Sequence, residues 1–437
     1  MLLSDLNEDV LRIIITSLVT STAQIDVLNL ARTCRSLHRI VRLFVVASIN
    51  VNLPSPRYHL LKRTLDNDPS YGLEVRSLQI GRLERQYLSS LIMKGDDTFA
   101  FFQQLPRLKV LRAESSIPRV AWCLLSPDLT LRKSLQKLYL RDVKLTALKL
   151  IDIICLPQLH DLDIGVLMSF KDDSILNLED RENKLQHLSL CGNEILFSTL
   201  SFITRNSPNL HTLIYRAPLH EPAFVDRGPG IYPAAGNLCP SRVLSALLPL
   251  SNTLTNLEIY ANGQQMRWRT EISAHDGSRL DLTEFLALKS LSASAELFVA
   301  PLSSRIPREG LYKLLPRSLK RLHLDFRYRI NIFDPLPTVY LPFKPAEYEN
   351  ERRKEHLERV CRLSLAYTWI LELAQYKAER GSDLEFVKLQ EGENSCFYIT
   401  EKWNVPADVD DAFERAGINL KIYVRGEFQV WLGAAHC

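Results

Sequence analysis

The side chains that could do metal or nucleophilic chemistry are scattered along the chain. Of the ten histidines, four fall inside or beside an apolar strand pattern, namely His160, His187, His211 and His323. The eight cysteines form no Cys-x-x-Cys pair and no Cys/His cluster at zinc-ligand spacing; they are Cys34, Cys123, Cys155, Cys191, Cys239, Cys361, Cys396 and Cys437. We therefore predict no metal site, and we expect the four histidines to be surface or core residues. The scattered cysteines suit a protein that resides in a reducing compartment.

Motifs for covalent or phosphate chemistry are also missing from the sequence. The chain has no Gly-x-Ser-x-Gly, His-Glu-x-x-His or Walker pattern. The glycines of 228–236 (GPGIYPAAG) suggest a phosphate loop at first sight, but they do not lead from a strand into a helix, and the prolines indicate an irregular loop. We predict no catalytic residue and no cofactor, and we expect the protein not to be an enzyme.

Length and charge limit the number of domains and the kinds of partner that the protein can have. At 437 residues the chain is too long for one compact core and long enough for two domains or a repeat array. The formal net charge of +4 is small for this length, which argues against nucleic acid as the partner. Acidic residues stand where a signal peptide carries positive charge (Asp5, Glu8, Asp9), and no apolar stretch is long enough to span a membrane. We expect a protein of the cytoplasm, the nucleus or both, with no membrane partner.

A leucine repeat predicts the strands and helices of this chain. The pattern Leu-x-x-Leu-x-Leu, or a close variant, occurs at 108–113, 135–140, 159–164, 185–190, 210–215, 254–259, 288–293 and 319–324, with weaker copies beginning at Val75 and Leu384. From 108 to 210 the copies begin 27, 24, 26 and 25 residues apart, and segments at helical spacing, such as 145–156 and 195–206, lie between them. We predict an α/β fold in which a short strand alternates with a helix and neighbouring units share one core.

With this spacing the chain resembles the leucine-rich-repeat proteins, whose units are about 20–29 residues long. The resemblance implies an irregular solenoid with long rim loops over 75–345, followed at 346–437 by a long helix and a C-terminal capping repeat. The family's asparagine after the strand is present at Asn193, with a near match at Asn262. Because the asparagine ladder is mostly missing, we expect an irregular arc.

The N-terminal segment has two predicted helices, at 6–18 and 27–41. In the first, Val10, Leu11, Ile14 and Leu18 fall on one face, and other apolar residues lie outside that face. A helix that is apolar over most of its circumference must be covered on more than one side. The second helix can cover one face only, so something else must cover the rest.

Residues 1–45 resemble an F-box, which would form a small all-α helical domain ahead of a linker or first cap at 46–74. Asn7 stands in place of the family's proline, and Leu37 in place of its aromatic residue. What the resemblance implies is docking on a Skp-type linker protein through the residues on pattern positions: Leu6, Val10, Leu11, Ile14, Leu18, Leu28, Leu30, Cys34 and Leu37.

An F-box ahead of leucine-rich repeats implies the substrate-recognition adaptor of a Skp–cullin–F-box ubiquitin ligase. The F-box would bind the linker protein, and through it the cullin, while the solenoid would bind a protein substrate. An alternative stays open, because residues 3–43 can instead be a helical cap on the first repeat. The protein would then be a non-catalytic leucine-rich-repeat scaffold without a ligase role.

The sequence places substrate recognition at the strands and the rim loops. The residues between the strand leucines form a mostly polar row of mixed charge: Arg112, Tyr139, Asp163, Ser189, Ile214, Glu258, Ser292 and His323. Three insertions follow strands, at 216–242, 261–281 and 325–347, and we expect them side by side on one rim. Aromatic and arginine side chains favour interfaces, so the candidate substrate contacts are Trp268, Arg267, Arg269, Phe224, Tyr232, Phe326, Tyr328 and Arg327.

Overall fold

The computed structural model divides the chain into two compact units, Met1–Leu185 (unit 1) and Gln186–Cys437 (unit 2). The boundary lies within residues 75–345, which were predicted to form one repeat array. The structure describes the residues outside the following segments and positions: 1–6, 8, 12, 16–28, 53–54, 82–94, 114–125, 127, 169–181, 193–196, 218–219, 225–232, 262–273, 276, 300–307, 327–331, 333–366, 392–397 and 429–437.

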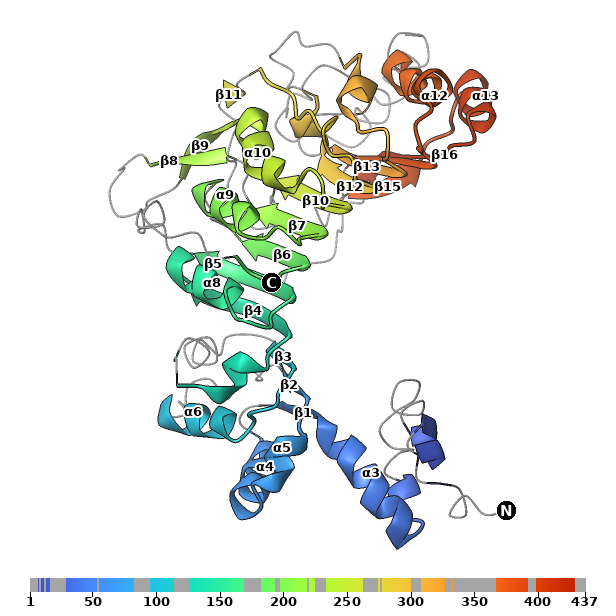
Figure 1. Ribbon diagram of the computed structural model, residues 1–437. Helices are drawn as coiled ribbons and strands as arrows, with labels where there is room; N and C mark the ends of the chain where they lie inside the picture. Colours follow the sequence, from blue (N-terminus) through green and yellow to red (C-terminus); the bar gives the residue numbers. More distant parts are fainter. Residues whose placement is uncertain are drawn as a thin grey trace. The chain divides into compact units, whose positions relative to one another are not determined.

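Unit 1 is a parallel sheet with helices and turns between its strands (Figure 1). Helical residues at 9–11, 13–15 and 29–31 come first. The elements that follow are α3 (Arg35–Ala47), β1 (Ser48–Asn52), α4 (Pro56–Asn67), α5 (Ser70–Glu74), β2 (Ser77–Gly81), α6 (Gly95–Gln103), β3 (Val110–Ala113), the 3₁₀ turn η3 (Thr130–Lys133), β4 (Lys137–Leu145), α8 (Ala147–Ile154) and β5 (Asp161–Met168). The strands lie in the order β1-β2-β3-β4-β5, and the pairs in this order are parallel.

Two helices of unit 1 begin at side-chain caps that the sequence supplies. The hydroxyl of Ser55 accepts a hydrogen bond from the backbone N–H of Tyr58 at 3.2 Å, and Pro56 occupies the first turn of α4. The hydroxyl of Thr146 does the same for the N–H of Lys149 at 3.4 Å, where α8 begins. These caps satisfy backbone donors that have no partner inside the helix.

The strand leucines of unit 1 form one buried row. Successive residues of a strand point to opposite faces of the sheet, so a leucine at every strand centre builds one apolar face. The register partners on β2 to β5 are fully buried: Leu78, Leu111, Leu138 and Leu162. The residues that follow them form a second row on the opposite face: Gln79, Arg112, Tyr139 and Asp163.

Unit 2 repeats this architecture with more strands. Its elements are β6 (His187–Gly192), α9 (Phe197–Arg205), β7 (Thr212–Ala217), β8 (His220–Phe224), β9 (Pro233–Leu238), α10 (Pro240–Leu247), η5 (Leu248–Leu250), β10 (Asn256–Ala261), β11 (Ala274–His275), β12 (Ser290–Ser294), η6 (Ala295–Leu297), η7 (Leu311–Leu314), β13 (Arg321–Phe326), α12 (Thr368–Arg380), β14 (Phe386–Glu391), β15 (Tyr398–Lys402), α13 (Ala407–Arg415) and β16 (Asn419–Phe428). The main sheet has the order β6-β7-β10-β12-β13-β14-β16-β15, and only its β15–β16 pair is antiparallel.

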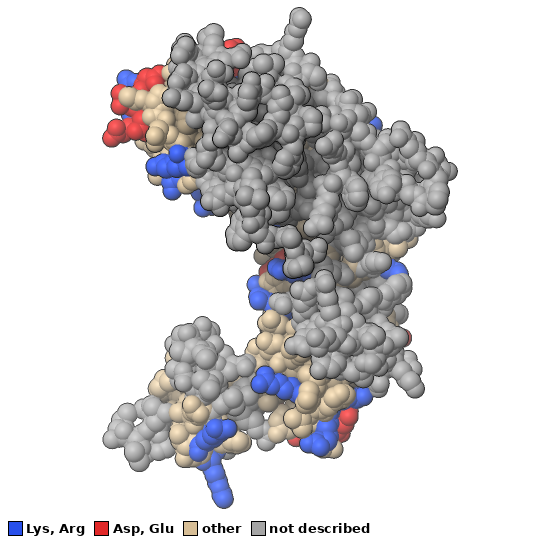
Figure 2. Space-filling view, turned by 180° about the vertical axis from the view of Figure 1, so that it is seen from behind, with Lys and Arg blue, Asp and Glu red and all other residues tan. Residues whose placement is uncertain are grey.

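The helices of unit 2 bury apolar residues against one side of this sheet. Helices α9 and α10 lie on the same side of β6, β7 and β10 (Figure 1), and the hydroxyl of Thr204 in α9 donates to the carbonyl of Ala246 in α10 at 2.5 Å. The C-terminal helix α13 differs, because it is strongly acidic. In the space-filling view, acidic side chains gather at the end of unit 2 that carries α13 (Figure 2).

One backbone hydrogen bond recurs at almost every step of the array. The residue just before a strand donates its N–H to the carbonyl of the equivalent residue before the preceding strand. The distances are 2.8 Å for Gln136 to Lys109, 2.9 Å for Thr255 to His211, and 2.8 Å for Lys289 to Thr255. The bond continues at 2.9 Å from Lys320 to Lys289 and at 2.8 Å from Glu385 to Lys320. Within each unit, successive repeats are therefore aligned by the same contact, although the sequence between the strands varies in length.

The predicted alternation of strands and helices is confirmed, and the chain is an α/β protein. A strand begins two residues into every copy of the leucine pattern, from β2 in the copy at Val75 to β14 in the copy at Leu384. The predicted helical segments 145–156 and 195–206 contain α8 and α9. Among the described residues, the connection from β3 to β4 contains the 3₁₀ turn η3, and the connection from β12 to β13 contains η6 and η7. Such turns serve as short connectors. Over the described residues, no helix is long and apolar enough to cross a membrane.

Two of the three predicted rim loops contain strands. The insertion 216–242 holds the antiparallel pair β8–β9, and the insertion 261–281 holds β11, which pairs in parallel with β9. In that pairing Ala274 and His275 are the partners of Asn237 and Leu238. These two insertions therefore lie side by side, as predicted, through backbone pairing that the sequence pattern did not indicate. The third insertion, 325–347, lies mostly outside the described residues.

The predicted long helix at the start of the C-terminal region is described only as α12, a helix of 13 residues. Trp369 and Tyr376, seven residues apart on one face of this helix, pack against the preceding repeat. The hydroxyl of Tyr376 donates to the carbonyl of Leu315 at 3.1 Å, and the ring of Trp369 lies 6.0 Å from that of Phe326 on β13. Gly381 ends the helix with φ of 64°, a left-handed conformation that favours glycine.

Candidate functional site

The polar rows on the strands carry the side chains that are available for recognition. In unit 2 the row predicted from the sequence is confirmed by the strand register, and it continues onto two further strands: Ser189, Ile214, Glu258, Ser292, His323, Lys388 and Lys421. Apolar residues flank each member of the row, and nearly all of them are buried. The sheet therefore displays one continuous face of mixed polarity, which we call the polar face of unit 2.

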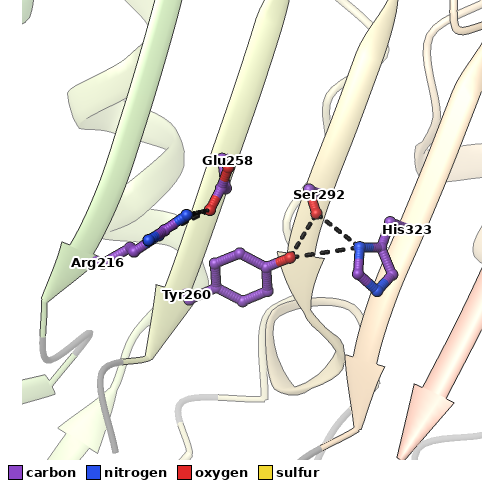
Figure 3. A network of polar contacts seen from close by, with 5 residues as sticks. All are labelled: Arg216, Glu258, Tyr260, Ser292 and His323. Atoms are coloured by element: carbon purple, nitrogen blue, oxygen red, sulfur yellow. Dashed lines mark hydrogen bonds and ion pairs between the residues drawn. The ribbon is translucent and has the colours of Figure 1, made fainter. Parts of the chain in front are cut away.

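The centre of this face is a network of polar contacts (Figure 3). Nε of Arg216 donates to Oε1 of Glu258 at 2.7 Å, and the two residues lie on the neighbouring strands β7 and β10. The arginine side chain is half exposed, so solvent screens this ion pair and its contribution to stability is small. Its role at the surface is to hold both charges in defined positions.

Beside the ion pair, a hydroxyl–imidazole cluster spans three strands (Figure 3). Oγ of Ser292 lies 3.0 Å from Nδ1 of His323, and the hydroxyl of Tyr260 lies 2.5 Å from the same Oγ and 3.4 Å from Nδ1. Burial lowers the pKa of His323, and the ammonium group of Lys388 acts in the same direction. Asp325, Glu258 and a hydrogen bond with Gln390 oppose this shift but do not reverse it. The imidazole is therefore neutral at neutral pH.

The contact between Ser292 and His323 has the separation of a nucleophile and its general base. However, the Tyr260 hydroxyl already contacts the same serine oxygen, and Ser292 lies in the middle of a strand. The geometry is that of a rigid hydrogen-bonding surface, and it favours recognition over acyl transfer.

The equivalent row in unit 1 is satisfied by its own neighbours. The guanidinium of Arg112 lies 4.6 Å from the centre of the Tyr139 ring, and the Tyr139 hydroxyl donates to Oδ2 of Asp161 at 2.8 Å. Lys137 contacts the same carboxylate at 3.4 Å. Burial and the hydrogen bond to Asp161 raise the pKa of the Tyr139 phenol. Arg112, Tyr139, Lys137 and Asp161 are thus held by contacts with one another.

The predicted linker-binding residues form a small core of their own. Leu11 and Leu37 are buried, together with Ile15, Ile40 and Val41, and two further predicted residues, Leu30 and Cys34, pack partly buried against this cluster. The thiol of Cys34 also accepts the N–H of Leu37 at 3.5 Å, where α3 begins. Part of the predicted docking set is therefore internal packing, because the helical residues cover one another.

An apolar surface remains beside this core. Val10 is 43% exposed and Ile13 is 70% exposed, whereas Ile14 is half-buried. Ile13 was not among the predicted contacts, because the chosen face ran through Leu11 and Ile14. The signal that could have found it is the apolar character of the helix on all sides. Three predicted contacts, Leu6, Leu18 and Leu28, lie outside the described residues.

The predicted substrate contacts are only partly described. Phe326 is fully buried at the end of β13 against Trp369, so its ring is not available to a substrate and we withdraw it as a candidate. Phe224 ends β8, and its side chain is not described. The other candidates lie outside the described residues: Tyr232, Arg267, Trp268, Arg269, Arg327 and Tyr328.

Potential metal ligands do not gather in the described part of the chain. None of its histidine, cysteine, aspartate and glutamate side chains form a group of three that could hold a metal ion.

The polar row predicted from the sequence ended at His323. The prediction was incomplete at its C-terminal end. It therefore missed Lys388 and Lys421, which lie on β14 and β16; the weak copy of the leucine pattern at Leu384 was the available signal.

No protein-family model matches the chain, and no curated protein matches it.

Proposed function

We propose that this protein is the substrate-recognition adaptor of a Skp–cullin–F-box ubiquitin ligase. In this proposal residues 1–45 form an F-box-like helical domain that docks on the Skp-type linker protein. The strand–helix array is an irregular leucine-rich-repeat solenoid whose polar face and rim bind a protein substrate. The adaptor itself carries out no chemistry.

The observation that carries the proposal is the exposed apolar side chain of Ile13. The helical segment that holds it already has a core, since Leu11 and Ile15 pack with Leu37. Ile13 is 70% exposed and Val10, three residues earlier on the same segment, is 43% exposed, so two apolar side chains are exposed together beside an existing core. Such a pair favours a partner surface over a requirement of folding. Burying it fully in an interface would contribute roughly 1.5–3 kcal/mol, or about a tenfold to 150-fold change in affinity.

A second observation supports the adaptor over an isolated helical module. The chain runs from α3 directly into β1, the first strand of the parallel array. A partner bound at Ile13 would thus be joined to the first strand of unit 1 without an intervening loop.

The test is a pull-down of a Skp-type linker protein and its cullin by the full chain. Val10→Asp with Ile13→Asp should abolish recovery of both, because two apolar contacts are replaced by buried charges. Leu286→Asp is the matched control, since Leu286 is 71% exposed in unit 2 and far along the chain. Recovery that is equal for both variants would instead support a scaffold with a helical cap and no ligase role.

A further inference from the structure

The last strands of unit 2 carry neighbouring lysine side chains on the polar face. Lys388 and Lys421 are register partners on β14 and β16, and Lys388 is also the register partner of the neutral His323 on β13. Arg321 is exposed on the same face, two residues before His323. Neighbouring strands are about 4.8 Å apart, so the two lysines lie side by side. Like charges placed directly opposite each other destabilise a sheet unless an anion neutralises them.

Each of the two lysines lies over an aromatic ring on the strand of the other lysine. Nζ of Lys388 on β14 lies 5.4 Å from the ring centre of Tyr423 on β16. In return, Nζ of Lys421 on β16 lies 5.7 Å from the ring centre of Phe386 on β14. A ring face attracts a cation through its electrostatic field and occupies few of its N–H donors. Both ammonium groups are positioned while retaining donors for an oxygen ligand.

The described acidic side chains do not neutralise this row. Within the described part of the chain, neither Lys388 nor Lys421 forms an ion pair with a carboxylate. Glu258 pairs with Arg216, and Glu385 pairs with Lys320 at 3.1 Å. Asp325 shares the face of His323 but is only 8% exposed. Glu391, also on β14, is buried and accepts the N–H of Ile332, and further acidic residues lie on helix α13. Among the described residues the row therefore keeps a net positive charge.

We propose that this C-terminal basic patch (Arg321, His323, Phe386, Lys388, Lys421 and Tyr423) binds an acidic peptide segment. Carboxylate side chains would accept hydrogen bonds from the lysine and arginine donors, and an extended segment would lie across the strands. This inference deepens the proposed function, because the segment would belong to the protein substrate.

A peptide fits the patch better than a nucleic acid does. Single-stranded nucleic acids bind by stacking bases on free aromatic faces along an extended basic track. Here a lysine ammonium already lies over each ring. The basic side chains also end at β13. Beyond it, the register partner of His323 is Ser292, and the partner of Ser292 is Glu258. The patch therefore suits a short run of carboxylates.

The experiment measures binding of a labelled peptide of alternating glutamate and glycine to the purified full chain by fluorescence anisotropy. The variant Lys388→Gln with Lys421→Gln removes both charges. The matched control is Lys313→Gln with Lys289→Gln, since Lys313 lies 5.6 Å from the ring centre of Tyr312 outside the patch. Two exposed charge contacts should raise the dissociation constant about fivefold to thirtyfold. The control should stay within about twofold.

Three further arms make the result decisive. Lys388→Arg with Lys421→Arg should restore binding, a glutamine–glycine peptide should not bind, and oligothymidylate should bind more weakly than the glutamate peptide. Equal affinity of the wild type and the double glutamine variant would overturn the proposal, and so would absent binding or preferred binding of oligothymidylate. The assay contains no linker protein, so its failure is distinct from failure of the ligase role in the pull-down.

Discussion

Ser292 and His323 are register partners on neighbouring parallel strands, and Oγ of Ser292 lies 3.0 Å from Nδ1 of His323. The Tyr260 hydroxyl completes the cluster at 2.5 Å from Oγ. Three residues from three repeats, far apart in the chain, thus share one hydrogen-bonded centre. The cluster favours a neutral imidazole, because burial and the ammonium group of Lys388 both lower the pKa of His323.

This lowered pKa makes the stability of unit 2 depend on pH. The unfolded chain takes up the His323 proton near the ordinary pKa of 6.5, whereas the folded chain takes it up at a lower pH. Stability from this group is therefore full above pH 6.5 and is lost as the pH falls through the folded pKa. We expect the melting temperature of the wild type, relative to His323→Gln, to decrease between about pH 7.5 and pH 5.

Thermal melts of both proteins at a series of pH values test this prediction. His38→Gln, which changes an exposed histidine of α3, serves as the comparison. The opposite result is a melting temperature of the wild type that increases relative to His323→Gln as the pH falls. It would show that Asp325 and Glu258, which raise the pKa of His323, dominate over burial and Lys388.

The leucine row predicts the cost of removing a core side chain. Leu322 on β13 is fully buried between its register partners Leu291 and Val387. Leu322→Ala should lower the free energy of unfolding by about 2–5 kcal/mol, from lost burial and the cavity left behind. Leu286→Ala, at a position that is 71% exposed, should change it by less than about 0.5 kcal/mol. Urea unfolding followed by circular dichroism measures both, and equal effects would contradict the assignment of the core.

Gly381 makes a separate prediction about the end of α12. Its φ of 64° lies in the left-handed region, and a Cβ added there would meet nothing within 4 Å. The cost of Gly381→Ala is therefore purely conformational, roughly 1–2 kcal/mol. Gly381→Asn should cost less, because asparagine tolerates this conformation better. Urea midpoints rank the variants, and an alanine variant as stable as the wild type would rule out this role of glycine.

The N-terminal core distinguishes a folding residue from a docking residue. Leu11 is 3% exposed among Ile15, Leu37, Ile40 and Val41, so Leu11→Asp places a charge in an apolar core and should unfold the helical segment. Ile13→Asp should leave it folded, because that side chain is 70% exposed. Limited proteolysis of the first fifty residues reads out the difference. Equal protection of both variants would mean that Leu11 is not a core residue.

The leucine spacing alone determined the strands and the face that each presents. The alternation of side chains along a strand is local, so a leucine followed two residues later by another apolar residue specifies its own buried side. Leu111, Leu138 and Leu162 follow this rule, and their strands lie where the repeat predicts them. The polar row from Arg112 to His323 follows for the same reason.

The tertiary structure decided the relations between residues that are distant in the chain. The pairing of β9 with β11, the exchange of aromatic partners between Lys388 and Lys421, the exposure of Ile13 and the burial of Phe326 all depend on which segments meet. A local pattern shows that a helix is apolar all round or that a loop is aromatic, but it does not show what covers either one. Covering requires a second segment in a definite register, and only the packing of the folded chain sets that register.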